Sequence, residues 1–186
     1  MVYFIAYLIG GIHSGVLISK FLKINDPRNA GSKNVGATNM WRLHGWQLGM
    51  TTFFFDVLKI FIINVIGYYY FHHGKFNVLL MSLGTLGHLF PIQNPYKGGK
   101  GIACTIMLLF LYNYFLFLTA ITSWLISYKF TNTSGISASI AMFMCFVCSF
   151  LYPINMDIAC IQIILILCLF KHRINIIDAF TEFQSN

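Results

Sequence analysis

The sequence predicts an all-α membrane protein, a bundle of transmembrane helices that forms a single domain over residues 1–186. Two observations predict this class. Hydrophobic residues make up 58% of the chain and charged residues only 9%, whereas a soluble domain carries roughly 25% charged residues. The apolar residues also form long runs, and the charges gather mainly in three short polar segments. Because so few charges cannot cover a globule with polar surface, we expect lipid to be the solvent.

The apolar runs of the first half set the first expected helices. The first run covers residues 2–19. The segment 1–22 around it has no basic n-region and no small-residue cleavage site after it, so it is interpreted as a retained helix and not as a signal peptide. Residues 47–71 form the second run and residues 76–90 a third, shorter one. A bilayer core of about 30 Å needs roughly 20 helical residues, which the second run supplies.

The second half holds three more apolar runs, of which the first is too long for one upright span. Residues 102–130 form either one tilted helix or two short helices that bend near Asn113. The runs 136–151 and 154–170 follow and are joined at Pro153.

The polar segments decide the expected number of crossings. Basic residues dominate residues 20–42, 91–101 and 171–173, and the positive-inside rule places all three on the cytoplasmic face. Because the second and third segments then lie on the same side, the chain must cross the membrane an even number of times between them. Splitting residues 102–130 satisfies this and gives seven spans, with the N-terminus outside and the C-terminus cytoplasmic. The alternative is five spans, with one run re-entrant or merged.

The first polar segment, residues 31–42, has the composition of an anion-binding loop. Gly31 and Gly36 let backbone N–H groups approach an anion closely. Arg42 adds a planar guanidinium fork suited to phosphate. The alternative is a cytoplasmic loop of turn residues that carries a positive-inside arginine. Hydroxyl and amide side chains supply neutral donors in this segment: Ser32, Asn34, Thr38 and Asn39.

The second polar segment covers residues 87–101 and gives the stronger anion signal. Its last part, Lys-Gly-Gly-Lys-Gly, runs directly into an apolar helix, where unpaired N–H groups and the positive end of the helix dipole attract anions. Lys97 and Lys100 add full positive charge. The motif is not a Walker A loop, because glycine follows Lys100 where serine or threonine is required. The alternative is a positive-inside loop with a flexible hinge.

The third polar segment is His172-Arg173-Ile174-Asn175. His172 and Asn175 lie three residues apart, so a helical turn would place them on one face. Taken alone, the segment is better explained as a helix end at which His172 and Arg173 complement the C-terminal dipole.

Asp56 and Lys59 place opposite charges inside the second apolar run. A charge at the bilayer centre costs about 2.5–3.5 kcal/mol even on a lenient insertion scale. Their i, i+3 spacing favours a structural ion pair that also borders the site over a direct catalytic role. His72 and His73 fall on the outer side in the predicted topology, so we expect them to take no part in catalysis.

Several chemistries are excluded by the sequence. It contains no Gly-x-Ser-x-Gly nucleophile elbow, no His/Glu metal-binding spacing and no His-x4-Asp signature, so we expect no metal site. Cys145 and Cys148 have redox spacing, but their apolar neighbours favour packing cysteines. The net charge of +7 is better explained by cytoplasmic loops that face anionic lipid or substrate than by nucleic acid. We therefore expect no nucleic-acid partner.

Together, the three segments resemble the motifs of the bacterial acyl-phosphate:glycerol-3-phosphate acyltransferase family. That family's pattern is S-G-N-x-G-A-T-N-x-x-R, then G-H-x-x-P-x5-K-G-G-K-G-x-A-T, then H-R-x-N-I. This chain reads SKNVGATNMWR, GHLFPIQNPYKGGKGIAC and HRINI in the same order and with the same spacing. Its opening YLIGGIHSG also resembles the family's N-terminal helix.

The resemblance implies a seven-helix enzyme without a metal or cofactor, in the bacterial cytoplasmic (inner) membrane, with its active site facing the cytoplasm. It would transfer an acyl group from acyl phosphate to the sn-1 hydroxyl of glycerol 3-phosphate, giving lysophosphatidic acid and phosphate. This is the first acylation of phospholipid biosynthesis. The peripheral enzyme that makes acyl phosphate is a candidate partner. Alternatives are a small membrane transporter of anionic metabolites and a degraded, non-catalytic membrane protein.

The motif positions also imply roles for single residues. Because acyl phosphate is already activated, positioning and positive charge suffice without a covalent nucleophile. A donor phosphate oxygen is the favoured acceptor of the hydroxyl proton, with His172 as the rival base. Five residues are expected to hold glycerol phosphate and the reacting groups: Ser32, Arg42, Lys100, His172 and Asn175. The expected substrate-binding residues are Asn34, Gly36, Thr38, Asn39, His88, Lys97, Gly98, Gly99, Gly101 and Arg173.

The chain departs from the family pattern at three places. Lys33 stands where the first motif usually has glycine, and Cys104 stands where the second usually has threonine. Beyond the third motif the usual R-L-x-x-G-x-E is replaced by residues 178–184, so that Gln184 takes the place of an acid. The tail after Asn175 is therefore the weakest part of the resemblance.

Overall fold

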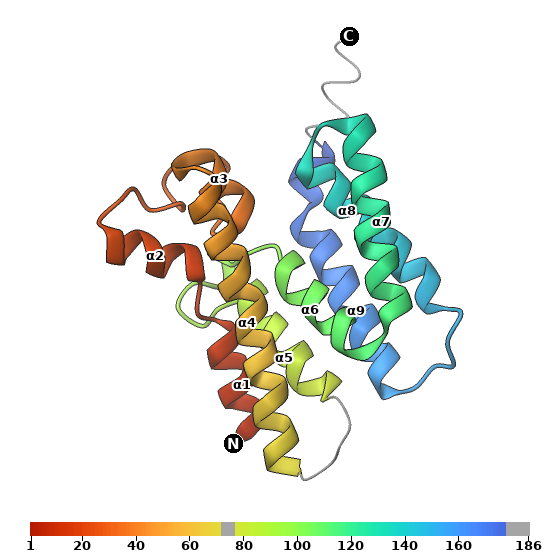
Figure 1. Cartoon of the computed structure of the whole chain (residues 1–186). Coiled ribbons are helices and arrows are strands. Elements are labelled where there is room, and N and C mark those ends of the chain that lie inside the picture. The colour runs from red at the N-terminus through yellow and green to blue at the C-terminus, as the bar shows by residue number, and fades with distance from the viewer. Residues whose placement is uncertain (72–76, 178–186) are drawn as a thin grey trace. The chain divides into compact units, whose positions relative to one another are not determined.

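The computed structural model describes residues 1–71 and 77–177, and these residues form helices and turns with no β-strand among them (Figure 1). The predicted all-α class is confirmed. The helices fall into two compact units, Met1–Leu108 and Leu109–Asn186, each of which is described by itself. The expected single domain stays a prediction. His72 and His73 lie outside the described residues, as do Asp178, Glu182 and Gln184 of the tail.

The first unit opens with two short helices where the sequence predicts one. Helix α1 (Val2–Gly10) and helix α2 (Ser14–Leu22) meet at an angle of 55°, so the prediction of a single helix over residues 1–22 is wrong. At the break His13 takes an extended backbone conformation (φ −92°, ψ 109°). The carbonyl of Ile12 accepts a hydrogen bond from the buried side chain of Lys59 at 2.9 Å. The Lys59 side chain therefore donates a hydrogen bond to a backbone carbonyl that has no partner within the interrupted helix.

The polar segment after α2 contains a helix that the sequence analysis did not predict. Helix α3 (Ala37–His44) follows the loop of the first motif, and helix α4 (Trp46–Phe71) follows α3 after a single residue, Gly45. Gly45 has φ +89° and ψ 167°, a conformation that only glycine adopts without strain. The predicted helix over residues 47–71 is confirmed.

The rest of the first unit carries the second motif. Helix α5 (Val78–Leu89) leads through a short 3-10 turn, η1 (Pro95–Lys97), to helix α6 (Ile102–Tyr112). Helix α1 packs closely along α5, since a Cβ added at Gly10 would lie 1.8 Å from the carbonyl oxygen of Gly84. Small residues of this kind let the backbones of two apolar helices approach each other.

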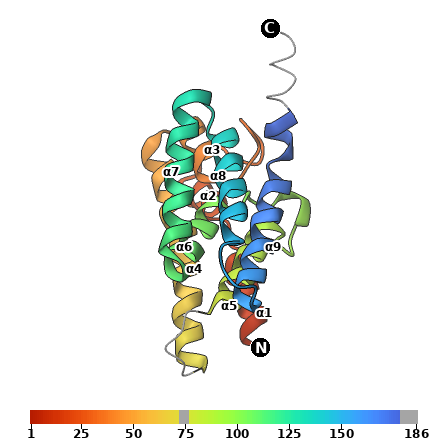
Figure 2. The same ribbon diagram turned by 90° about the vertical axis from the view of Figure 1, so that its right-hand side faces the viewer.

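The second unit is built from helices α7 (Tyr114–Thr131), α8 (Ser134–Ser149) and α9 (Met156–Lys171). The predicted division near Asn113 is confirmed. Asn113 has extended backbone angles (φ −149°, ψ 104°), and its side chain accepts a hydrogen bond from the N–H of Leu116 at 3.0 Å, which caps α7. Helices α7 and α8 pack along each other (Figure 2).

The lengths of the helices bear on the membrane prediction. Among the described helices, α4 is long and apolar enough to cross a bilayer, and the bent pair α1 and α2 would be a second candidate; α5, α6 and α8 are apolar but shorter. Many large apolar side chains are exposed, including Phe54, Leu125 and Phe143, as lipid-facing surfaces require. The number of seven spans and the sides of the two termini stay predictions.

Candidate active site

The first motif forms a loop that leads directly into the N-terminus of α3. Gly36 is the N-cap residue, with no side-chain cap bond, so the first turn of α3 begins immediately after the loop. Thr38 and Arg42 lie four residues apart on this helix, which places them on one face. Both are exposed, and so is Ser32 in the preceding loop. Of the residues of this motif with predicted contacts to substrate, Ser32, Thr38 and Arg42 are thus accessible to a ligand.

Asn39 organises the same loop from inside. It is 1% exposed, and its Oδ1 accepts a hydrogen bond from the N–H of Ser32 at 2.9 Å. The sequence places Asn39 among the substrate-binding residues, but the hydrogen bonds of its side chain go mainly to the chain's own backbone. Its two amide N–H groups lie among three carbonyl oxygens within hydrogen-bond distance of Nδ2, at 2.9, 3.1 and 2.9 Å, those of Pro27, Ala30 and Asn34.

One guanidinium nitrogen of Arg42 lies near the Asn39 side chain. Its Nη1 lies 3.4 Å from Oδ1 of Asn39, which is at the long end for a hydrogen bond. A weak tether of this kind leaves the guanidinium group able to turn toward a ligand.

Lys33 takes a backbone conformation that explains the glycine of the family pattern. Its φ is +56°, in the left-handed region that costs a residue with a Cβ roughly 1–2 kcal/mol. The substitution of lysine for glycine therefore adds backbone strain, besides the charge and side chain that the sequence indicates.

The charges of residues 20–42 are unevenly balanced. Asp26 is the only acidic residue in this range and pairs with Arg28 at 2.6 Å. Hydrogen bonding to that guanidinium lowers the pKa of the Asp26 carboxyl below its usual value. Asp26 is paired with Arg28. The charges of Lys33 and Arg42 therefore give the motif a net positive charge.

The second motif folds back tightly onto the end of α5. The N–H of Gly99 donates to the carbonyl of His88 at 3.0 Å. A Cβ added at Gly99 would lie 2.0 Å from Nε2 of His88, and one added at Gly98 would lie 2.0 Å from the carbonyl oxygen of Leu89. These two glycines are therefore required for packing, in addition to the close approach to phosphate that the sequence predicts.

The end of this motif leads into the N-terminus of α6. Gly101 has φ +84°, and its carbonyl accepts the hydrogen bond from the N–H of Thr105 at 2.8 Å that opens the helix. Lys97 is exposed and Lys100 partly so. The predicted glycine-rich loop before a helix is confirmed, and two cations accompany it.

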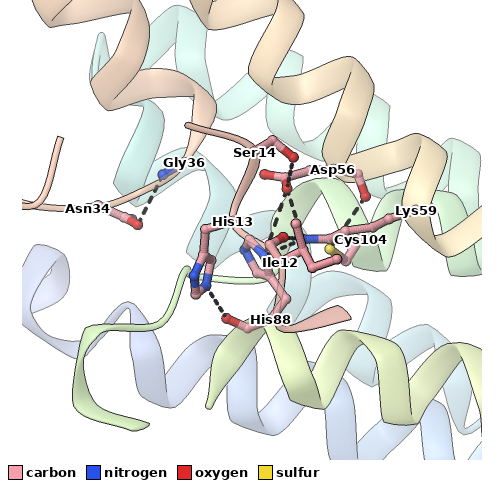
Figure 3. Close-up of polar contacts among 9 residues, drawn as sticks. All are labelled: Ile12, His13, Ser14, Asn34, Gly36, Asp56, Lys59, His88 and Cys104. Atoms are coloured by element: carbon pink, nitrogen blue, oxygen red, sulfur yellow. Dashed lines mark hydrogen bonds and ion pairs between the residues drawn. The ribbon is translucent and has the colours of Figure 1, made fainter. Parts of the chain in front are cut away.

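His88 of the second motif belongs to a buried polar cluster (Figure 3). The predicted ion pair of Asp56 and Lys59 is confirmed, with Nζ 2.9 Å from Oδ1. The same Nζ lies 2.8 Å from Nδ1 of His88. Because an ammonium group only donates, Nδ1 of His88 is the acceptor, and a neutral His88 ring then carries its proton on Nε2.

The cluster extends to the break between α1 and α2. Ser14 donates to Oδ1 of Asp56 at 2.8 Å, and Nε2 of His13 lies 3.1 Å from the carbonyl oxygen of His88. Neither residue was singled out from the sequence. The available signal was a polar pair, His13-Ser14, that interrupts an apolar run.

The first motif also contacts this region of the chain. A Cβ added at Gly15 would lie 2.4 Å from the carbonyl oxygen of Val35, so the loop of the first motif packs on the start of α2. Gly15 is the neighbour of Ser14, which bonds Asp56. The loop of the first motif therefore packs next to a segment that takes part in the buried cluster.

The third motif lies in the second unit, at the end of α9. His172 is 2% exposed and follows the helix as its C-cap residue. Its Nδ1 lies 2.8 Å from the carbonyl oxygen of Cys168, which only accepts, so Nδ1 carries the proton and Nε2 is the basic nitrogen of the neutral ring.

The chain continues beyond His172 as a helical turn. The N–H of Ile176 donates to the carbonyl of His172 at 3.3 Å. The side chain of Asn175 packs on Gly135 of α8, where an added Cβ would lie 2.2 Å from its Nδ2. Arg173 is exposed, and its guanidinium stacks 4.3 Å from the ring centre of Phe170. A site shared with the two motifs of the first unit stays a prediction.

These features define a class of protein: an all-helical chain with exposed apolar helices and basic, glycine-containing loops at helix N-termini. The family model for glycerol-3-phosphate acyltransferase matches residues 1–182. The chain belongs to the glycerol-3-phosphate acyltransferase family, and the resemblance drawn from its motifs is confirmed.

Curated relatives agree with this assignment. The glycerol-3-phosphate acyltransferase of Francisella tularensis subsp. holarctica (strain OSU18) is 34% identical over 172 residues, which cover 92% of this chain and 84% of that protein. The enzyme of the same name from Pseudoalteromonas translucida (strain TAC 125) is 33% identical over 182 residues, covering 97% and 89%.

Two solved structures are similar to this chain over almost its whole length. Both are crystal structures of PlsY, an integral membrane glycerol 3-phosphate acyltransferase. The glycerol 3-phosphate form superposes with a TM-score of 0.84 and the lysophosphatidic acid form with 0.81, each at 33% identity over 97% of this chain and 91% of that one. The predicted membrane class is confirmed by this likeness.

Proposed function

We propose that this protein transfers an acyl group from acyl phosphate to the sn-1 hydroxyl of glycerol 3-phosphate, giving lysophosphatidic acid and inorganic phosphate. The observation that carries the proposal is the pair of basic loops in the first unit. Residues 31–36 lead into α3 and residues 98–101 into α6. Helix N-termini preceded by such loops bind phosphate, and both proposed substrates carry a phosphate group.

The transfer needs no covalent intermediate. The sn-1 hydroxyl oxygen attacks the acyl carbon, a new ester C–O bond forms, and the bond between that carbon and the phosphate oxygen breaks. The hydroxyl proton passes to an oxygen of the departing phosphate, with His172 as the rival acceptor through its basic Nε2. What the protein supplies is alignment of the two substrates and positive charge where negative charge develops.

The proposed roles of the residues divide by exposure. Ser32, Arg42 and Lys100 are exposed or partly exposed and are proposed to hold the phosphate groups and the reacting atoms. His172 and Asn175 are proposed to orient the attacking glycerol from the third motif. Asn39 acts through the loop that it holds. The remaining contacts to the two phosphates are assigned to Asn34, Gly36, Thr38, Lys97, Gly98, Gly99, Gly101 and Arg173.

The proposed placement in the cell follows from charge and substrate. Seven spans in a bacterial cytoplasmic membrane, with the N-terminus outside, would bring all three basic motifs to the cytoplasmic face. A long acyl chain would stay among the helices while its phosphate head reaches the basic loops. The peripheral enzyme that makes acyl phosphate is then a natural partner at the same face.

Purified protein in detergent tests this function directly. With acyl phosphate and glycerol 3-phosphate together it should release phosphate and form lysophosphatidic acid, and omission of glycerol 3-phosphate should suppress the release. Absence of turnover combined with uptake of either substrate into liposomes would instead favour the transporter. Absence of both would favour a non-catalytic membrane protein.

A further inference from the structure

We propose that Lys59 is a positioning residue for the reaction: it fixes His88, and through His88 it sets the 97–101 loop in the arrangement that binds a substrate phosphate. Lys59 is 7% exposed and its partner Asp56 2%. The hydrogen bonds of Lys59 go to groups of the chain itself, so we assign it no direct contact with substrate. The inference rests on the proposed function for the identity of the substrate.

The ammonium group of Lys59 is saturated by acceptors from three different segments. Its three N–H donors are matched by the carbonyl of Ile12 at 2.9 Å, Oδ1 of Asp56 at 2.9 Å and Nδ1 of His88 at 2.8 Å. One acceptor lies at the break between α1 and α2, one on α4 and one near the end of α5. A single buried charge thus ties together three elements that are distant in sequence.

Stability alone is a weak explanation for this arrangement. Burying two charges costs desolvation free energy that their attraction often fails to recover, and well-packed apolar residues frequently serve as well. An ion pair of Asp56 with Lys59 would also need no contact with His88. The additional hydrogen bond restricts the His88 ring to one orientation and one neutral tautomer.

The orientation of His88 is transmitted to the loop by direct contact. Its ring lies so close to Gly99 that an added Cβ would come within 2.0 Å of Nε2, while its carbonyl accepts the N–H of Gly99 at 3.0 Å. Rotation of the ring would therefore displace Gly99. Lys97 and Lys100 lie two residues before and one residue after Gly99, so they would move with it.

The test removes the charge pair without leaving an unpaired ion. The double variant Asp56→Asn, Lys59→Met keeps similar volumes and deletes the hydrogen bond to His88. A second variant, Lys59→Arg, keeps the charge but cannot direct its planar donors to the same three acceptors. The matched control is Ser149→Ala, Gln162→Leu, which deletes a partly buried hydrogen bond of 3.0 Å in the second unit.

Kinetic assays give kcat and the apparent KM for each substrate. Calorimetry gives the affinities for glycerol 3-phosphate and for inorganic phosphate. A thermal unfolding curve first verifies that each variant is folded. We expect both Lys59 variants to raise at least one KM, and the corresponding dissociation constant, tenfold or more. kcat should fall less than threefold, and the control should stay within twofold of wild type. Variants that lose thermal stability but bind phosphate and substrate normally would overturn the proposal.

A double-mutant cycle with Gly99→Ala tests whether Lys59 acts on the 97–101 loop through His88 and Gly99. If Lys59 acts through His88 and Gly99, combining Gly99→Ala with Lys59→Arg should raise KM little more than the worse single change does. Multiplicative effects would show that Lys59 acts elsewhere and would contradict the inference. Wild-type turnover judges the proposed function separately, because the calorimetric comparison needs no catalysis.

Discussion

Lys33 is one of the positions at which this chain departs from its family's pattern. The residue holds a left-handed conformation (φ +56°) that the usual glycine adopts without cost. A strained residue inside the first motif identifies the physical reason for that glycine.

Lys33→Gly should therefore stabilise the protein. Relief of the left-handed strain outweighs the greater flexibility of glycine in the unfolded chain, so we expect a gain of up to about 1 kcal/mol in the free energy of unfolding. Thermal unfolding in detergent measures it. Lys33→Ala is the control, because it removes the charge and keeps the strain; an equal gain in that variant would assign the effect to charge.

Arg42 and Lys100 supply the positive charge of the two loops. Removal of a single donor to developing negative charge in an active site costs about a hundredfold to a thousandfold in rate. We expect Arg42→Ala and Lys100→Ala each to lower kcat/KM by at least about a hundredfold without unfolding the protein. Lys129→Ala, at an exposed lysine near the end of α7, is the control. Normal rates in both variants would make the site assignment wrong.

At the scale of the elements, two breaks between helices are each stabilised by a side-chain hydrogen bond. The break at residues 11–13 is closed by a lysine from α4, and the break at Asn113 is closed by its own side chain. The second could be predicted, because residues 102–130 exceed the length of one span. The partner that closes the first could not, because Lys59 lies 47 residues away from Ile12 in the sequence.

Asn113 offers a test of the second break. Its side chain caps α7 and also accepts a hydrogen bond from the Tyr152 hydroxyl at 3.2 Å. Asn113→Ala should lower the free energy of unfolding by about 1 kcal/mol, as loss of an N-cap usually does. Asn113→Ser, which keeps an oxygen acceptor at the cap, should recover most of this loss. Equal stability of the alanine variant would show that the cap contributes little.

For the whole molecule, the topology is the property on which the proposed function depends. Only an arrangement that brings all three motifs to one face allows them to bind the same pair of substrates. Charge bias and the parity of crossings support seven spans.

Single cysteines placed in a background without native cysteines would measure this topology. In intact cells we expect Tyr114→Cys to react with a membrane-impermeant maleimide from outside, and Thr133→Cys to react only after the membrane is opened. Lys33→Cys is the cytoplasmic control. Labelling of positions 114 and 133 from the same side would favour five spans.

The sequence by itself determined the membrane class, the helical architecture, the family and the composition of the three motifs. These properties follow from local quantities: the length of an apolar run, the rarity of charge, and the spacing of glycines and cations. It also predicted the Asp56–Lys59 pair, because two opposite charges one turn apart in an apolar helix must pair.

Only the tertiary structure decided what those residues contact. It showed that Asn39 holds the backbone of its own loop, that Gly98 and Gly99 make room for α5, and that Lys59 reaches the α1–α2 break and His88. Each of these contacts joins segments that packing brings together. Local sequence patterns do not encode such distances, and they arise only when the helices are assembled.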